Sequence, residues 1–327
     1  MLRFESLGPT LIDCEGCSNY IAVYVEKPEN EVNNNEDKSK KIKKMTIIDR
    51  YIPMAEKIKN MEVYDDDIWV MSYPKCGTTW TQEMTWLINN NLDYETARKI
   101  DLSKRFPFLE LSGLLNNYPP GSEEVVFNAP RPRHIKSHLT VELLPDKMWT
   151  SNAKIIYVTR NPKDAALSFY HHYKNLVGYQ GSKEDFFDSY MDAKIIYAPF
   201  HDHVLGFWEI RDNPKILFLV YEDMKADLMP ALKKVSKFLG KSYTEEQFLK
   251  LADHLSVENM RKNPSCNNEV HLNDARKYHE ANYDENYKFI RKGKAGAFKE
   301  EISEEYIKKF DKWTEDNLQG TDFKFRC

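Results

Sequence analysis

The sequence predicts an α/β protein in which helices flank a central parallel sheet. Three short apolar segments have the composition of buried strands, at 67–73, 154–159 and 216–221. Each is followed by a segment with helical character, at 78–88, 162–173 and 231–239. Short apolar strands that alternate with helices are typical of βαβ units, whose strands pair in parallel.

Length and composition limit the class of protein. A chain of 327 residues allows two domains or one large α/β domain, and apolar residues at 41% exclude a disordered or collagen-like chain. The net charge of −4 argues against a general attraction to nucleic acid or acidic membranes. No apolar run approaches the ~20 residues of a membrane span. The first nine residues have no signal-peptide core, so we expect a cytoplasmic protein.

The composition changes near residue 45. The run Tyr20-Ile-Ala-Val-Tyr-Val25 is rich in strand formers and predicts a short hairpin or flap within residues 1–25. Residues 26–45 are polar and lysine-rich, which favours an exposed linker over a docking patch. We therefore expect an N-terminal extension at 1–45 and a main domain at 46–327.

Cysteine and histidine spacing gives little support for a metal site. The five cysteines are sparse and odd in number, which argues against a disulfide framework. Cys14-x-x-Cys17 has no second pair at zinc-finger spacing, so two ordinary thiols are favoured over zinc or redox chemistry. His201-Asp202-His203 has no clear third ligand, which favours a surface or packing role. We expect no metal.

The segment Tyr73-Pro-Lys-Cys-Gly-Thr-Thr-Trp80 joins the first predicted strand to its helix. Anionic ligands bind at such junctions, because the helix start offers unpaired N–H groups and the positive end of its dipole. Gly77 would let the backbone come close, Lys75 supplies a positive charge, and Thr78 and Thr79 supply hydroxyl donors. This pattern favours phosphate binding over a tight turn with a capping threonine.

The segment is not a standard nucleotide-triphosphatase loop. In G-x-x-x-x-G-K-[ST] the lysine follows the second glycine, whereas Lys75 precedes a single glycine, Gly77. We also find no convincing apolar strand that ends in a magnesium-binding aspartate. Both absences weaken hydrolysis of ATP or GTP and favour transfer of an anionic group without a metal.

The same segment resembles the 5′-phosphosulfate loop of the cytosolic sulfotransferases. The family's 3′-phosphate motif resembles the segment at 157–170, and its R-K-G-x-x-G-x-x-K motif is matched at 291–299. The segment at 133–138 resembles the one that carries the catalytic histidine, and two further family blocks are matched at 220–224 and 260–264. The resemblance runs in order from about residue 45 to the C-terminus. It implies one P-loop-like α/β sulfotransferase domain at 46–327.

The resemblance also implies the donor, 3′-phosphoadenylyl sulfate (PAPS), whose product is adenosine 3′,5′-bisphosphate (PAP). Lys75 and the helix start would hold the phosphosulfate, and Arg160 with Ser168 would hold the 3′-phosphate. Taken alone, Arg160 fits a salt bridge at a helix start equally well, and residues 291–293 fit a solvated basic loop. The donor-binding residues implied by the resemblance are Lys75, Cys76, Gly77, Thr78, Thr79, Trp80, Arg160, Ser168, Tyr221, Leu255, Ser256, Met260, Arg291, Lys292 and Gly293.

Catalysis needs a group that removes a proton from the acceptor hydroxyl or amine as it attacks sulfur. A histidine suits that role near neutral pH, and His138 matches the family's catalytic position. On a strand, Lys136 and His138 would project to the same face. Lys75 and Lys136 could stabilise the charge that develops on the leaving group.

The acceptor pocket implied by the resemblance consists of Tyr51, Phe108, Leu111, Lys136, His138, Phe169 and His172. Aromatic side chains at these positions favour a flat, apolar small molecule such as a phenol, a steroid or a retinoid-like alcohol. Several of them fit the protein core equally well. Some insect relatives dehydrate an allylic alcohol through a sulfated intermediate, and that variant stays open. The rival interpretations are an ATP-dependent small-molecule kinase and an inactive binding module, and the presence of Lys75 and His138 argues against the latter.

Two positions depart from the family pattern. Cys76 stands where serine is common, but the backbone N–H binds the phosphate there, so we expect function to survive. The family's dimer motif, K-x-x-x-T-V-x-x-x-E, keeps Lys299, whereas Ser303-Glu304 replaces Thr-Val and Lys308 replaces the glutamate. A homodimer of the usual kind is therefore in doubt.

Overall fold

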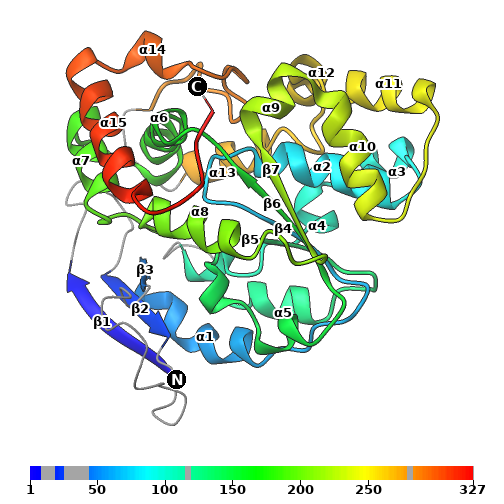
Figure 1. Ribbon diagram of the computed structural model, residues 1–327, viewed down its shortest axis with the longest axis horizontal. Coiled ribbons are helices and arrows are strands. Elements are labelled where there is room, and N and C mark those ends of the chain that lie inside the picture. Colours follow the sequence, from blue (N-terminus) through cyan, green and yellow to red (C-terminus); the bar gives the residue numbers. More distant parts are fainter. Residues whose placement is uncertain (9–18, 26–43, 115–118, 278–282, 327) are drawn as a thin grey trace.

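The structure is a computed structural model that describes residues 1–8, 19–25, 44–114, 119–277 and 283–326. A four-stranded parallel sheet lies at its centre, with helices around it (Figure 1). In spatial order its strands are β5 (His134–Ser137), β4 (Ile68–Met71), β6 (Lys154–Thr159) and β7 (Ile216–Val220). The predicted α/β class with a central parallel sheet is confirmed.

Both faces of this sheet are buried. In β4, Ile68 and Val70 belong to one apolar core, whereas Trp69 and Met71 belong to the other. Strands that are covered on both faces have continuous apolar sequences, which is why the sequence predicts them without an alternating pattern.

Helices pack on both faces. The face of Ile68 and Val70 is covered by α2 (Thr78–Asn89), α10 (Leu228–Phe238) and α11 (Glu245–His254). The face of Trp69 and Met71 is covered by α6 (Pro162–His172), α8 (Phe200–Glu209) and α15 (Glu304–Leu318). The remaining described α-helices are α1 (Ile52–Lys59), α3 (Tyr94–Lys99), α4 (Leu102–Arg105), α5 (Ser122–Phe127), α7 (Lys183–Met191), α9 (Tyr221–Ala226), α12 (Val257–Lys262), α13 (Glu269–Arg276) and α14 (Phe298–Glu301).

The predicted elements lie close to the observed ones. The strand expected at 154–159 coincides with β6, and the helix expected at 162–173 ends one residue earlier and continues as a π-turn, Tyr173–Val177. Tyr221 was expected in the third strand, but it begins helix α9. The strand β5 was not among the three predicted strands, because His134 and Lys136 interrupt its apolar pattern. His138 lies directly after the end of β5.

A second sheet is formed by the N-terminal strands β1 (Leu2–Gly8), β2 (Tyr20–Val25) and β3 (Lys44–Ile48), all antiparallel. Thr46 connects it to the main body, because its N–H donates to Ala198 O at 2.8 Å and its carbonyl accepts from the N–H of Tyr197 at 2.6 Å. The expected boundary between residues 45 and 46 therefore falls within β3, and the division into extension and main domain stays a prediction. Most of the expected linker, and the pair Cys14 and Cys17, lie outside the described residues.

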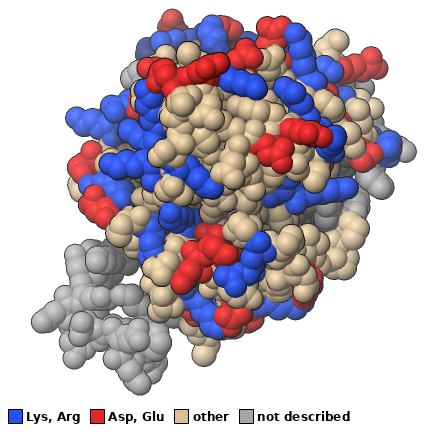
Figure 2. Space-filling view, turned by 90° about the vertical axis from the view of Figure 1, so that its right-hand side faces the viewer, with Lys and Arg blue, Asp and Glu red and all other residues tan. Residues whose placement is uncertain are grey.

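The surface shows no large field of one charge on the face drawn in Figure 2, where Lys and Arg are interspersed with Asp and Glu. Among the described helices, none is both long enough and apolar enough to span a bilayer.

Candidate active site

A cavity of about 760 Å³ lies where the strands of the central sheet end. Residues that come after β4, β5, β6 and β7 line it: Lys75 lies in the loop after β4, and His138, Arg160 and Tyr221 directly follow their strands. The loop at 289–294 and helix α13 complete its wall. Ligands of open parallel sheets bind outside the carboxyl ends of the strands, so the fold places this cavity where a binding site is expected.

The loop before α2 has the geometry of an anion cradle. Lys75 and Gly77 adopt positive φ angles of 67° and 103°. A Cβ atom at Gly77 would lie 2.7 Å from Cδ2 of Tyr221, so only glycine fits there. No side chain caps the start of α2, which leaves its first backbone N–H groups available to an anion.

Lys75 lies in a concentration of positive charge. Burial, followed in order of size by the charges of Lys136, Arg160 and Arg291, together lower its pKa to about 7. Its Nζ atom lies 4.0 Å from the ring centroid of Phe289, and no carboxylate of the described residues pairs with it. Because Lys75 has no counter-ion of its own, an anion bound here would relieve its repulsion from the neighbouring cations.

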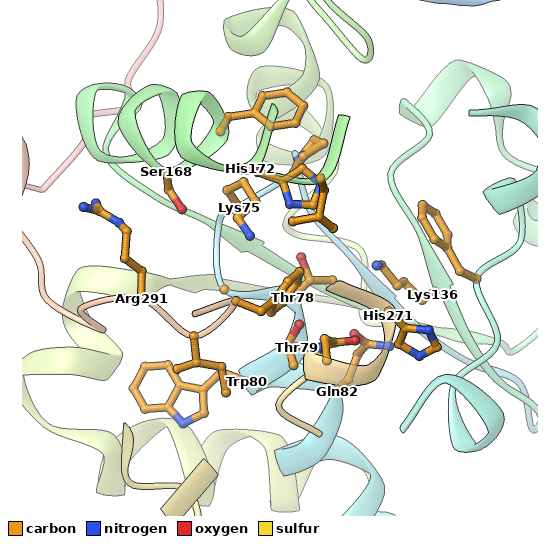
Figure 3. A pocket seen from close by; sticks show the side chains of 18 of the residues that line it. Lys75, Thr78, Thr79, Trp80, Gln82, Lys136, Ser168, His172, His271 and Arg291 are labelled. Carbon is orange, nitrogen blue, oxygen red and sulfur yellow. The ribbon is translucent and has the colours of Figure 1, made fainter. Parts of the chain in front are cut away.

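Arg160 provides a second cationic position beside the loop at 73–80. Arg160 donates from Nη2 to Lys294 O at 3.0 Å and from Nη1 to Lys75 O at 3.3 Å. Its nearest carboxylate, Asp164, is 3.9 Å away, so Arg160 serves mainly to join two loops of the cavity. The hydroxyl of Ser168 has no hydrogen bond to any described residue. Figure 3 shows Ser168 on α6 between Lys75 and Arg291. These side chains can surround a second anionic group.

The basic loop at 291–294 is held in place by packing and ion pairs. Arg291 donates to Glu301 at 2.6 Å, and its side chain is only 18% exposed, so it does not belong to a freely solvated loop. Gly293 has φ +57°, and a Cβ atom there would lie 2.4 Å from Cγ2 of Val257. The loop therefore approaches the start of α12 so closely that only glycine fits.

Part of the cavity wall near these cations is apolar. Trp80 donates from Nε1 to Leu255 O at 2.9 Å, and its ring centroid lies 5.7 Å from that of Tyr221. Leu255 and Met260 line the cavity beside them. Two predicted donor-site residues contribute no side chain here: Cys76 is fully buried in the core, and Ser256 caps α12 by accepting from the N–H of Asn259.

His138 is held in one tautomer. Its Nδ1 lies 2.7 Å from the carbonyl oxygen of Ser72, which can only accept, so Nδ1 carries the proton. The other ring nitrogen, Nε2, is therefore the basic atom. Burial lowers the pKa of His138 well below its usual value, and Lys136 adds to the effect, so the ring is neutral near pH 7. This arrangement can accept a proton from a group bound in the cavity.

Glu110 holds the backbone of His138 in place, and the sequence analysis did not name it. Its Oε1 accepts from the backbone N–H of His138 at 2.6 Å and from the hydroxyl of Tyr197 at 3.1 Å, whereas its Oε2 has no partner among the described residues. Burial raises the pKa of Glu110 to about 7. Its signal in the sequence is a lone carboxylate in the apolar run that begins at Phe106.

The predicted acceptor residues are only partly brought together. Phe108, Leu111, Phe169 and His172 line the cavity with Lys136 and His138. Tyr51 does not line it; Tyr51 is fully buried and packs behind Gly113. Further lining residues that the sequence analysis did not name include Gln82, Leu102, Ser103, Phe106, Leu114, Tyr173, Val177, Tyr197, His271 and Phe289.

The His201-Asp202-His203 motif has a packing role. His203 bonds with its two ring nitrogens to the hydroxyl of Tyr157 and to the carbonyl of His138, and both histidines are buried. Within the part of the chain that the structure describes, no group of three or more metal-ligating side chains occurs.

Comparison with known proteins identifies the family. The family model of the sulfotransferase domain matches residues 65–322. Luciferin sulfotransferase of Photinus pyralis is 39% identical over 288 residues, covering 84% of this chain and 77% of that protein. Human sulfotransferase 1C2 is 33% identical over 271 residues, covering 82% and 88%.

Solved structures agree with this assignment. Retinol dehydratase in complex with retinol and PAP superposes with a TM-score of 0.84 at 28% identity, covering 99% of both chains. A mouse sulfotransferase complexed with PAP shares the fold, with a TM-score of 0.65 at 24% identity, over 85% of this chain and 93% of that one. The chain belongs to the sulfotransferase family and is an enzyme of its cytosolic type.

Proposed function

We propose that this enzyme transfers the sulfuryl group of PAPS to a hydroxyl group or amine of a small apolar acceptor in the cytoplasm. The observation behind this proposal is that two cationic positions line one cavity, namely Lys75 in the loop before α2 and Arg160 with Arg291 beside it. PAPS carries anionic groups at both the 5′ and the 3′ positions of its ribose, whereas ATP carries them at the 5′ position only. The solved retinol dehydratase structures, which hold PAP, support this choice of donor.

The donor end of the cavity fits PAPS residue by residue. Lys75 with the backbone of Cys76, Gly77, Thr78 and Thr79 would hold the phosphosulfate at the start of α2. Arg160, Ser168 and Arg291 would hold the 3′-phosphate, and Lys292 and Gly293 would close the loop over it. Trp80, Tyr221, Leu255 and Met260 offer an apolar wall to the base, and Ser256 orders the start of α12.

PAPS supplies an activated sulfuryl group whose departure leaves negative charge on the bridging oxygen. His138 accepts the proton of the acceptor at Nε2 while its Nδ1 stays bonded to Ser72. Lys75, assisted by Lys136, stabilises the charge that develops on the leaving group. Every role in this scheme is filled by a side chain, so we expect no metal to be needed.

The acceptor is proposed to be a phenol, a steroid or a retinoid-like alcohol. Aromatic and aliphatic side chains of the wall, including Phe106, Phe108, Leu111 and Phe169, suit a flat apolar molecule. The solved retinol dehydratase structures hold retinol or androsterone, which supports this class. The curated relatives are sulfotransferases, which favours a sulfated product over the dehydrated one and over phosphoryl transfer.

A homodimer stays possible, although Lys308 reverses the charge expected in the family's dimer motif.

Thermal melting with nucleotides tests the proposed donor. PAP is expected to raise the melting temperature far more than AMP or ADP, because only PAP offers a phosphate to both cationic groups. Equal shifts from all three would contradict the assignment of Arg160 and Arg291 to a 3′-phosphate. Chelation of magnesium is expected to leave turnover intact, and loss of turnover on chelation would favour a kinase.

A further inference from the structure

Gln82 is a buried polar side chain without a partner. It lies on α2 one helical turn beyond Thr78 and Thr79, lines the cavity, and is only 3% exposed. No hydrogen bond joins its amide to any residue that the structure describes. Buried amides in native proteins are nearly always hydrogen-bonded, and an unpaired one is costly. The amide of Gln82 is therefore available to a ligand of the cavity.

Gln82 lies at the acceptor end of the cavity. Figure 3 shows Gln82 and His271 on the side of Lys136, away from Ser168 and Arg291. The cations that would bind the two phosphates of the donor thus lie toward the opposite side.

Two more polar groups face the same end. Asp101 accepts from the N–H and the hydroxyl of Ser103 at 2.8 and 2.6 Å, and Nε2 of His271 lies 3.6 Å from its Oδ1. Burial would raise the pKa of Asp101, but the nearby His271 and the hydrogen bonds from Ser103 outweigh it and lower the pKa to about 2. Asp101 thus fixes Ser103 and His271, both of which line the cavity.

The charged side chains at this rim do not favour an anion. Asp274 pairs with Lys277 at 2.7 Å, and Asp101 faces His271. A carboxylate or phosphate on the acceptor would meet two aspartates here without an excess of cations. A neutral group that can donate and accept hydrogen bonds matches an amide and a hydroxyl better.

We infer that Gln82, assisted by Ser103 and His271, forms a subsite for a second, neutral polar group of the acceptor, such as a hydroxyl or carbonyl. The preferred acceptors are thus apolar molecules with two polar groups: one reacts at His138 and the other binds at Gln82. This inference rests on the proposed function, which it deepens by naming the acceptor class.

Paired acceptors test the subsite. Monohydroxy compounds are compared with the matching diols in a series of increasing length: phenol and hydroquinone, para-phenylphenol and its para,para′-diol, and a steroid mono-ol and diol. At one length or more, kcat/KM of the native enzyme is expected to favour the diol at least about fivefold, as one or two neutral hydrogen bonds allow. Gln82→Leu is expected to bring that ratio close to one.

Controls separate the possible causes. Gln319→Leu makes the same change at an exposed position outside the cavity and should keep the native ratio. Gln82→Met provides a second apolar variant in case Gln82→Leu does not fold. A para′-carboxylate analogue of the biphenyl diol should be a poorer acceptor than the diol, and a preference for it would contradict a neutral subsite.

The outcomes that overturn the inference are distinct from failure of the proposed function. If the native enzyme and Gln82→Leu share the same diol ratio at every length, Gln82 does not recognise the acceptor. If Gln82→Leu instead raises the KM for PAPS and leaves the ratio unchanged, the amide belongs to the donor site. If no acceptor of any kind is sulfated by the native enzyme, the proposed function itself fails.

Discussion

The two ends of the cavity are built in different ways. At the donor end, Lys75 and Arg160 lie in segments that follow strands of the central sheet, and positive φ angles at Gly77 and Gly293 let the backbone approach closely. At the acceptor end, the wall consists of aromatic side chains from the segment at 106–114 and from α6, with α13 beside them. The topology of the sheet thus places the charges that we propose bind the donor, whereas loops and helix faces shape the proposed acceptor pocket. His138 lies where the two ends meet.

The largest effect is expected from His138→Ala. This variant tests whether His138 acts in the transfer step and not in binding of the donor. The variant should lower kcat by roughly 10²-fold or more, the range of a positioned general base. The affinity for PAP, measured by calorimetry, should change little. The assay belongs near pH 7 and should include an aliphatic alcohol, because a phenol is partly ionised at high pH and needs less help. Normal turnover of both acceptors would mean that His138 is a structural residue.

Lys75→Met should affect both binding and turnover. Its charge would meet the donor in the ground state and in the transition state, so we expect kcat/KM for PAPS to fall about 10- to 100-fold and PAP binding to weaken. Lys237→Met, at an exposed position in the last turn of α10, is the matched control and should behave like the native enzyme. A loss of kcat with unchanged PAP affinity would remove Lys75 from the ground-state donor site.

Gly293→Ala sharpens the claim that the donor end depends on close backbone packing. The added Cβ would lie 2.4 Å from Val257, so the basic loop must shift, and the Kd of PAP should rise about tenfold. Gly296→Ala is a strong control, because Gly296 also has a positive φ, of +75°, yet a Cβ there would meet no atom within 4 Å. If the two variants weaken PAP binding equally, backbone strain and not packing is responsible.

Glu110→Gln tests how the groups between the two ends are positioned. The amide keeps an acceptor for the N–H of His138 but loses the negative charge that raises the pKa of Lys136, which burial lowers to about 8. We expect kcat to fall about three- to tenfold, and its alkaline limb should move to lower pH because Lys136 loses its proton earlier. Glu123→Gln changes another buried carboxylate, which pairs with Lys57 outside the cavity, and should leave the pH profile in place. An unshifted alkaline limb in Glu110→Gln would remove the electrostatic role.

The smallest expected effect is the uptake of a proton when PAP binds. Lys75 has a pKa of about 7 without ligand, so at pH 8 it is mostly neutral, and a bound phosphate raises that pKa. Binding of PAP at pH 8 is therefore expected to take up close to one proton, with a further contribution from Lys136. Calorimetry in buffers of different ionisation enthalpy measures this uptake, and Lys75→Met should reduce it. Binding enthalpies that do not depend on the buffer would contradict the charge cluster described above.

The loop before α2 could be singled out from the sequence as a candidate anion site because its parts are local. The run from Tyr73 to Trp80 contains a strand end, a turn and a helix start in eight consecutive residues, so its spacing already carries the chemistry. Apolar runs predicted β4, β6 and β7 for the same reason. The short strand β5 was not predicted, because its four residues alternate in polarity and form no apolar run.

The acceptor end was harder to predict because it depends on contacts between distant segments. Tyr51 is an aromatic residue like Phe108, and only the folded chain shows that the first lies in the core and the second lines the cavity. Glu110 and Gln82 are polar residues in largely apolar surroundings. Their roles follow from what surrounds them after folding, namely the backbone of His138 and the cavity near His271.

The reaction to be tested is transfer of a sulfuryl group from PAPS to a small acceptor, with His138 as the base. The most direct measurement incubates the enzyme with PAPS and a set of phenols, steroids and allylic alcohols, and follows acceptors and nucleotides by mass spectrometry. The account predicts that at least one acceptor gains one sulfuryl group, that PAP forms in equal amount, and that His138→Ala slows both together. PAPS that stays intact with every acceptor, or an acceptor phosphorylated when ATP is supplied instead, would contradict it.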